Sequence, residues 1–261
     1  MGESGGNVVD KNLGNLETVR ESLIRQEDSI IFSLIERAKH PINSPLYDDK
    51  KMPFADDSSV SLFHFFVKES EVLQSKAGCY TSPEENAFFP ENLPPPLLPP
   101  LNSTPVLHPP GASININEKI LNLYIETLLP LIAAKGDDGN YAVTAASDLN
   151  CLQALSRRIH FGKFVAEVKF KDCPEDYIPA IRAKDKDALM KLLTFESVEE
   201  RIKKRVEKKA MIFGQDVDVQ DNDNKGNKCK INPSVVSQLY GDWVMPLTKF
   251  VQVEYLLRRL D

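Results

Sequence analysis

The sequence contains few of the residues from which most enzyme centres are built. Its 261 residues include four cysteines and four histidines, and neither set has the close spacing of a zinc site or a CxxC pair. The glycine-rich patterns that bind phosphates and dinucleotides are missing, as is the GxSxG turn of serine hydrolases. We therefore expect reduced thiols, and any catalysis should need neither a metal nor a cofactor.

Long apolar runs and an excess of basic residues are also lacking. No run approaches the roughly 20 apolar residues that span a bilayer. The N-terminal MGESGGNVVDKN has neither the apolar core of a secretion signal nor the early arginines of a transit peptide. The net charge of -6 and the isoelectric point near 5.4 argue against a nucleic-acid partner, without excluding a local basic groove. These features predict a cytosolic protein with no membrane partner.

The chain does contain a series of segments in which apolar residues recur at intervals of three and four. Helices are expected over 16–39, 59–76, 115–135, 144–170, 174–183, 186–193 and 233–261. A further, strongly charged helix follows Ser197, which forms a capping box with Glu200. Pro130 and Pro246 should kink the helices that contain them. Because no convincing strand is present, the predicted fold is all-α: one domain over 1–261, built as a bundle of long helices.

Three segments do not follow the helical pattern. Residues 1–14 are expected to be disordered, and the polar segment 216–230 to form a mobile loop. Residues 91–112 are rich in proline, which favours an extended chain. This segment is either a linker between two domains or a strap across one domain. Its leucines and Val106 favour the strap, because a free linker has little use for apolar residues.

The stretch 155–170, LSRRIHFGKFVAEVKF, mixes five basic side chains with apolar ones. Arg158 and Lys169 are 11 residues apart, or about three helical turns, so a continuous helix would place them on one face roughly 16 Å apart. A cation at each end of a partly apolar face suits a small polyanion. The alternative is a solvated basic face whose long side chains reach into water.

Four further polar residues interrupt or border the apolar stripes of other helices. They are Arg20 in the first helix, Glu199 in the first turn of the charged helix, and Thr248 and Gln252, which share a face of the last helix. Together with Arg158 and Lys169 they would suit a small dicarboxylate that carries an ether or hydroxyl group, since arginine pairs with carboxylates in bidentate geometry. Spacing alone does not select these six from the other charged residues.

Three stretches in the same order closely resemble the eukaryotic chorismate mutases of plants and fungi. They are RESLIRQEDSIIFSLIERA, LQALSRRIHFGKFVAEVKF and PLTKFVQVEYLLRRLD. The resemblance covers nearly the whole chain, including SPEENAFFPENLP, and it is greatest to the cytosolic plant form. It implies an all-helical homodimer with one active site in the bundle of each chain. It also implies a cofactor-free, pericyclic conversion of chorismate to prephenate, the committed step toward phenylalanine and tyrosine.

The resemblance also gives roles to four of the six polar residues. Arg20 and Arg158 would bind the two carboxylates of chorismate, and Thr248 would assist one of them. Glu199 would accept a hydrogen bond from the ring hydroxyl. As an alternative for each position, Arg20 and Thr248 would be plain surface residues, and Glu199 would serve only the N-terminus of its helix.

The other two residues would act on the ether oxygen, where negative charge develops as the C–O bond breaks. Lys169 would donate a hydrogen bond to this oxygen, and Gln252 stands where the second donor belongs. Fungal members have a glutamate at the Gln252 position, and a carboxyl donates only when it is protonated. Fungal members also have an asparagine near the Glu199 turn, where this sequence has Phe195, which removes one polar contact.

Regulated relatives bind aromatic amino acids at a site in the dimer interface. The motifs of this site are a Gly-Ser pair after a GN turn and an arginine before the SPxE loop. The corresponding residues here are Gly139, Asn140, Ala142 and Val143 at the first motif, and Gly78 and Cys79 at the second. Because no arginine is left to pair with an amino-acid carboxylate, the sequence predicts an enzyme largely insensitive to aromatic amino acids.

A second hypothesis is that the chain is a helical interaction scaffold that has kept the fold and binds a partner without turnover. The intact set Arg20, Arg158, Lys169, Glu199 and Thr248 argues against it, because a decayed enzyme should lose charges that are costly to bury.

Overall fold

The computed structural model describes residues 16–49, 60–91, 93–99, 106–215 and 229–261. Within these ranges the chain forms helices and no strand, so the all-α, single-domain prediction is confirmed. The segment 1–14, nearly all of 216–230 and part of 91–112 lie outside the described residues. No helix in the described ranges combines the length and the apolar character that a membrane crossing requires.

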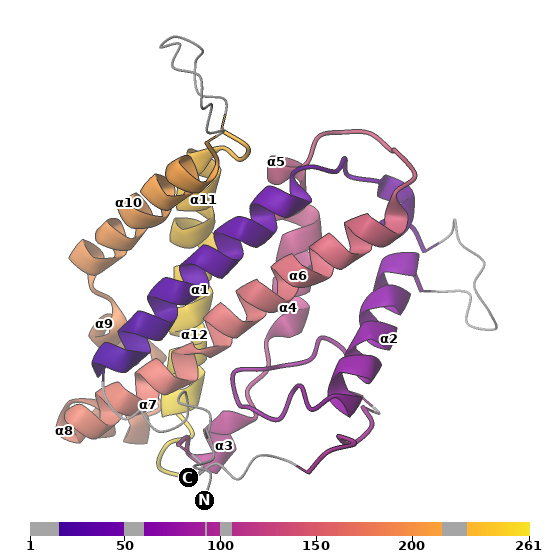
Figure 1. Ribbon diagram of the computed structural model, residues 1–261. Helices are drawn as coiled ribbons and strands as arrows, with labels where there is room; N and C mark the ends of the chain where they lie inside the picture. The colour runs from indigo at the N-terminus through magenta and orange to yellow at the C-terminus, as the bar shows by residue number, and fades with distance from the viewer. Residues whose placement is uncertain (1–15, 50–59, 92, 100–105, 216–228) are drawn as a thin grey trace, which may run out of the picture.

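Two long helices form the middle of the bundle. These are α1 (Leu16–Arg37) and α6 (Tyr141–His160), which lie side by side, and α7 (Gly162–Asp172) continues the line of α6 (Figure 1). Helix α1 buries Glu27, Ile30, Ile31 and Leu34, whose spacing of three and four places them on one face. It ends just before His40 and Pro41, as expected from the backbone that a proline imposes on the preceding residue.

The remaining helices surround this central pair. They are η1 (Ser44–Tyr47), α2 (Leu62–Lys76), α3 (Pro109–Ala112), α4 (Asn117–Leu123), α5 (Leu129–Ile132), α8 (Pro174–Arg182), α9 (Lys186–Leu193), α10 (Glu196–Phe213), α11 (Pro233–Leu239) and α12 (Met245–Leu256). Helices α10 and α11 lie on one flank and α2 on the other (Figure 1). Helix α8 packs against α7, and α9 packs against α8. Helix α12 packs against α6, α7 and α9.

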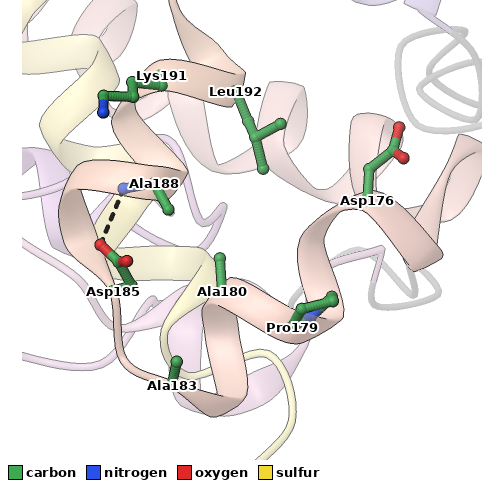
Figure 2. Close-up of a pocket in the computed structure, with 8 residues that line it drawn as sticks. All are labelled: Asp176, Pro179, Ala180, Ala183, Asp185, Ala188, Lys191 and Leu192. Atoms are coloured by element: carbon green, nitrogen blue, oxygen red, sulfur yellow. Dashed lines mark hydrogen bonds between the residues drawn. The ribbon is translucent and has the colours of Figure 1, made fainter.

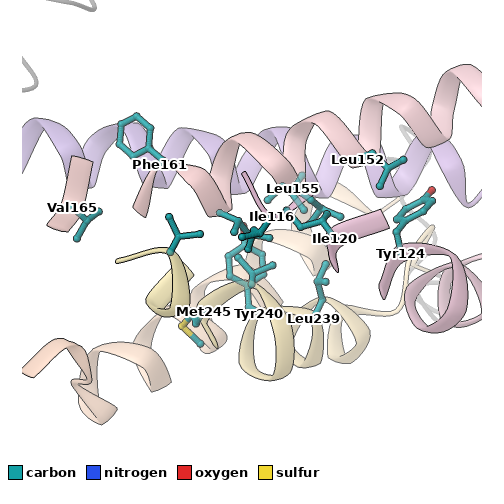
Figure 3. Packing of buried hydrophobic residues seen from close by; sticks show 14 of the residues in the cluster. Ile116, Ile120, Tyr124, Leu152, Leu155, Phe161, Val165, Leu239, Tyr240 and Met245 are labelled. Atoms are coloured by element: carbon teal, nitrogen blue, oxygen red, sulfur yellow. The ribbon is translucent and has the colours of Figure 1, made fainter. Parts of the chain in front are cut away.

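One hydrophobic core joins these elements beneath α6. Figure 3 shows Leu152 and Leu155 of α6 opposite Ile120 and Tyr124 from the α4 region, and close to Leu239 of α11. All five side chains are buried. Because elements from both halves of the sequence contribute to the same cluster, the chain folds as one unit.

The helices that contain Pro130 and Pro246 stay continuous by changing pitch. A π-helical turn, η2 (Tyr124–Leu128), precedes Pro130, and a second one, η3 (Tyr240–Val244), precedes Pro246. Proline has no N–H to donate, and its ring crowds the carbonyl four residues earlier. The wider π turn accommodates both effects without ending the helix.

The helix expected over 144–170 is two helices, so this prediction was wrong. It is divided at Phe161, whose carbonyl accepts hydrogen bonds from the N–H groups of both Phe164 (3.1 Å) and Val165 (3.4 Å). Gly162 explains the division. A Cβ atom at this residue would lie 2.8 Å from the carbonyl oxygen of Thr248, so only glycine lets α7 approach α12 this closely.

The described parts of the proline-rich segment lie against the bundle. Leu107 is part of the core, and the N–H of His108 donates to the Tyr255 hydroxyl of α12 at 2.8 Å. These contacts are those of a strap. Leu97 and Leu98, by contrast, are exposed, so these two leucines do not hold the segment in place.

A buried ion pair connects α1 to α6 at the far end of the bundle from α7. The guanidinium of Arg37 donates to the carboxylate of Asp148 and to the carbonyl of His40 at 2.9 Å. Asp148 also accepts hydrogen bonds from the hydroxyls of Tyr124, at 2.6 Å, and of Tyr47. Both charged side chains are fully buried, so each depends on its partners for solvation.

Replacing Asp148 with alanine is therefore expected to lower the free energy of unfolding by about 3–5 kcal/mol, because Arg37 keeps its charge without a counter-ion. Urea unfolding followed by circular dichroism measures the loss. Tyr47→Phe is the matched control, since it removes one hydroxyl from the same carboxylate and should cost only about 1 kcal/mol. Equal, small losses in both variants would contradict the assignment.

Candidate active site

The buried cation of the site is Arg158, in the last turn of α6. It is 3% exposed, its Nη1 atom donates to the Thr248 hydroxyl at 3.3 Å, and its guanidinium lies 6.0 Å from the centre of the Tyr240 ring. Burial lowers the pKa of Arg158, yet an arginine stays charged in proteins. Its Nε atom is buried with no hydrogen-bond partner. A buried, underused guanidinium is suited to receive a carboxylate.

Thr248 and Gln252 lie one turn apart on α12, and both are buried. The Thr248 hydroxyl accepts from Arg158 and donates to the carbonyl of Val244 at 2.6 Å. The amide oxygen of Gln252 is buried without a partner. A Cβ atom at Gly162 would lie 2.8 Å from the Thr248 carbonyl oxygen and 3.4 Å from Cγ of Gln252, so the start of α7 packs closely on this part of α12. Two underused polar groups, on Arg158 and Gln252, thus lie in the same interhelical region.

Lys169 is half-buried on α7, about two turns beyond Gly162. Its ammonium lies 4.8 Å from the centre of the Phe195 ring. Burial lowers the pKa of Lys169, and the positive charge of Arg20 lowers it further. Arg20 projects from an exposed position on α1. Helices α1 and α7 pack against one another, so the two cations lie on neighbouring elements.

Glu199 supplies the carboxylate at this end of the site. Its side chain forms an ion pair with Lys249 at 2.8 Å, and the same ammonium donates to the Thr194 hydroxyl at 3.3 Å. Lys249 follows Thr248 on α12, so one helix supplies both the threonine and the partner of the glutamate.

Helix α10 begins earlier than the sequence indicated, and the capping box predicted at Ser197 was wrong. The cap residue is Phe195, in an extended conformation, and its carbonyl accepts the N–H of Glu199 at 3.0 Å. No side chain caps this helix. Ser197 is therefore inside the first turn, while the Phe195 side chain lies over Lys169.

Contacts between helices connect five of the six predicted residues, and the sixth, Arg20, lies on α1, which packs against α7. Arg158 contacts Thr248, Gly162 contacts Thr248 and Gln252, and α12 reaches Glu199 through Lys249. At the start of α10, the ring of Phe195 contacts the ammonium of Lys169. Sequence reasoning missed Lys249 and Tyr240, because pairing between helices leaves no signal in residue spacing. The site is rich in cations and contains one carboxylate, which suits a small dianion with a hydroxyl group.

Two hollows elsewhere do not contain these residues. Figure 2 shows an open groove of about 590 Å³ between α8 and α9, where Asp185 is occupied in capping α9 through the N–H of Ala188 at 2.9 Å. A smaller hollow of about 80 Å³ is lined by Cys79 and by the ion pair of Arg157 with Glu85. In the described ranges no three His, Cys, Asp or Glu side chains gather as a candidate metal site.

Comparison with known proteins identifies the family. Residues 140–253 match the family described as Chorismate mutase type II. The chain is 62% identical to Chorismate mutase 2 from Petunia hybrida, over 95% of this chain and 94% of the relative. It is 54% identical to cytosolic Chorismate mutase 2 from Zea mays, over 95% of this chain and 96% of the relative. This chain belongs to the chorismate mutase type II family. The family inferred from the three sequence stretches is thus confirmed, and the chain is an isomerase.

Solved chorismate mutases have the same fold. The structure of AtCM1 with tyrosine in its allosteric site superposes with a TM-score of 0.86 at 54% identity, over 97% of this chain and 99% of that one. A Candida albicans chorismate mutase in complex with L-Trp gives a TM-score of 0.90 at 35% identity, over 98% of this chain and 96% of that one. The helical bundle is therefore shared by plant and fungal chorismate mutases.

The residues expected at the effector site of a regulated chorismate mutase occupy two separate regions, one before α6 and one after α2. Gly139 and Gly78 both have positive φ angles, 73° and 102°, as tight turns require. Asn140 precedes α6, and Ala142 and Val143 are exposed in its first turn. Cys79 is partly buried after the end of α2.

One chain does not bring these two regions together. The Tyr47 hydroxyl bonds Asp148 of α6, and its ring packs 5.3 Å from that of Phe63 at the start of α2. Gln153, further along α6, bonds Gln74 near the end of α2 at 2.6 Å. The turn before α6 and the segment after α2 therefore lie at opposite ends of α2, a helix roughly 22 Å long.

Proposed function

We propose that this chorismate mutase converts chorismate to prephenate by a cofactor-free pericyclic rearrangement at Arg20, Arg158, Lys169, Glu199, Thr248 and Gln252. The observation that supports the proposal most strongly is the buried Nε atom of Arg158, which has no hydrogen-bond partner, beside the contact between Arg158 and Thr248. Leaving such a donor unpaired in a protein interior is costly, so its retention points to a ligand that accepts from it.

Arg158 and Arg20 are the proposed carboxylate anchors. Arg158 is deeply buried and already oriented by Thr248, so it would hold one carboxylate in a fixed position. Arg20 is exposed on α1 and would close on the second carboxylate from the solvent side. Holding both ends of the dianion selects the compact conformer in which the two reacting carbons approach one another, which is a contribution of positioning.

The ether oxygen is the proposed target of Lys169 and Gln252. In the rearrangement a C–O bond breaks while a C–C bond forms, and negative charge grows on this oxygen without any nucleophile or proton transfer. A fixed ammonium and a fixed amide N–H aimed at the oxygen would stabilise the transition state more than the ground state. An amide donates at every pH, so we expect activity at neutral pH.

Glu199 is the proposed acceptor for the ring hydroxyl of the substrate. Its ion pair with Lys249 at 2.8 Å supports this role. The ammonium restricts the side chain to one orientation while leaving the second carboxylate oxygen available to accept a hydrogen bond.

A cytosolic homodimer is the proposed working form. The relative from Zea mays is named as cytosolic, and α2 and α6 carry exposed apolar side chains, Phe65, Leu73 and Val143, that a second copy would cover. Sedimentation of the purified chain would give the mass of a dimer. A monomer at micromolar concentration would contradict this part of the proposal.

Prephenate formation from chorismate by the purified chain, in the presence of a metal chelator, tests the function directly. Saturable turnover is expected, and Arg158→Ala should raise KM and lower kcat because it removes the buried anchor. The competing hypothesis of a helical scaffold predicts binding of a chorismate-like dianion without turnover. Binding measured by calorimetry in a preparation that forms no prephenate would favour that hypothesis.

The enzyme is further proposed to be largely insensitive to aromatic amino acids. Neither Gly78 nor Cys79 can pair with an amino-acid carboxylate as an arginine does, and Val143 stands where a small hydroxyl residue is expected. Tyrosine, phenylalanine or tryptophan at about 1 mM should therefore change kcat/KM by less than about twofold, a coupling near zero. AtCM1, which was solved with tyrosine in its allosteric site, is the positive control. Strong inhibition by tyrosine or activation by tryptophan below 1 mM would contradict the proposal.

A further inference from the structure

Phe195 combines two features that do not fit an ordinary cap residue. Its large apolar side chain is 52% exposed, although the start of a helix accepts small polar residues more readily. At the same time its ring lies 4.8 Å from the ammonium of Lys169. The Phe195 side chain thus lies outside the core, in contact with the ammonium of Lys169.

The ring is also the contact that favours the charge of Lys169. In the described part of the chain, Lys169 forms no hydrogen bond or ion pair. Burial and the charge of Arg20 both disfavour its protonated form and lower its pKa. The negative face of an aromatic ring attracts an ammonium, so Phe195 acts in the opposite direction to these two influences.

The other charged side chains of the candidate site lie on α10 and on three helices that pack against α7, namely α1, α6 and α12. On α10, Glu199 is paired with Lys249 of α12, and on α6, Arg158 is bonded to Thr248. The remaining one is Arg20 of α1, which repels the ammonium. None of them forms an ion pair with Lys169 in the described part of the chain.

We propose that Phe195 is a positioning residue for Lys169: its ring holds the ammonium charged and aimed into the site. Because the Phe195 carbonyl accepts the N–H of Glu199, the same residue also sets the start of α10 that carries the glutamate. Phe195 therefore affects the positions of both Lys169, the proposed donor to the ether oxygen, and Glu199, the proposed acceptor for the ring hydroxyl. The kinetic part of this inference rests on the proposed role of Lys169, whereas the contact itself does not.

Three variants distinguish the effect of the aromatic ring of Phe195 from the effects of its apolar bulk and of its backbone carbonyl. Phe195→Leu keeps an apolar side chain but removes the aromatic face, Phe195→Tyr keeps the face, and Phe195→Ala removes both. All three keep the backbone carbonyl that starts α10. Circular dichroism and thermal unfolding establish that each variant is folded before it is compared.

The first readout is the titration of the Lys169 ammonium, followed by NMR in lysine-labelled protein and assigned by the signal lost in Lys169→Met. Removing the ring in Phe195→Leu should raise the acid dissociation constant of Lys169 about 2- to 10-fold, the range that a cation–π contact supplies. Phe195→Tyr should titrate like the wild type. An unchanged titration in Phe195→Leu, or a shift in Phe195→Tyr as large as that in Phe195→Leu, would overturn the proposal.

The second readout is the pH profile of kcat. Since the protonated ammonium is the donor, turnover is retained below the pKa of Lys169 and lost as the pH rises through it. The alkaline limb in Phe195→Leu should therefore move to lower pH, with kcat reduced about 2- to 10-fold on that limb and KM little changed. A uniform loss at every pH would indicate a structural role only and would overturn the inference. Failure of the wild type to form prephenate would instead reject the proposed function, while the NMR titration would still test the contact.

Discussion

Lys169→Ala is expected to lower kcat for prephenate formation by about 10²–10³-fold, the cost of removing one preorganised donor to a developing oxyanion. The reason is that the ammonium is proposed to gain most of its interaction with the ether oxygen as the C–O bond breaks. KM should change much less, because the carboxylates of chorismate are proposed to bind Arg20 and Arg158. Steady-state kinetics on the purified variant gives both constants.

The structure provides a matched control on the same helix. Lys171 lies two residues beyond Lys169, is largely exposed and pairs with Glu167 at 3.1 Å, so Lys171→Ala should leave kcat unchanged. Lys169 has no ion pair in the described part of the chain, so its removal should also leave the helical circular dichroism intact. A Lys169→Ala variant that retains more than about a tenth of the wild-type kcat would refute the proposed role.

Helix positions could be predicted from the sequence because each helix buries one face. The stripe of α1 and the short helices α8 and α9 follow the apolar periodicity closely. The division between α6 and α7 could not be predicted in this way. It depends on the approach of Gly162 to Thr248, a residue 86 positions later in the chain, and local periodicity contains no information about that contact.

The start of α10 also could not be predicted from the local sequence pattern. Ser197 and Glu200 have the spacing of a capping box, yet the helix begins one residue before Ser197. Phe195 adopts the cap conformation, and its ring contacts Lys169 on α7. The true start of α10 therefore coincides with a tertiary contact, which the local sequence pattern does not reveal. A helix boundary is the feature that tertiary packing changes most readily.

For the site, the sequence supplied candidates and the family resemblance selected among them. Residue spacing placed Thr248 and Gln252 on one face of a helix, and both are buried. The partner of Glu199 could not be inferred, because Lys249 and Glu199 come from different helices that meet only in the folded chain. Pairing between helices depends on packing angles and helix ends, which are the least readable features of a single sequence.

Gln252→Glu is expected to convert an enzyme that works at neutral pH into one that works only in acid. At pH 8 the new carboxylate would have lost the donor and would place a negative charge beside the ether oxygen. We expect kcat/KM to fall by about 10²–10³-fold there. A carboxyl donates only in its protonated form, so activity should return as the pH falls through the pKa of the introduced glutamate.

The surroundings of residue 252 set the pH at which activity would return. Gln252 is 6% exposed, and burial raises the pKa of a carboxyl, whereas the positive charges of Arg158 and Lys169 lower it. Gln252→Ala is the matched control, because it removes the donor without adding a titratable group and should be impaired equally at all pH values. The pH profiles of kcat/KM for the wild type and both variants test whether residue 252 donates to the ether oxygen. A Gln252→Glu profile that follows the wild type, or an acid recovery that also occurs in Gln252→Ala, would show that residue 252 does not donate to the breaking bond.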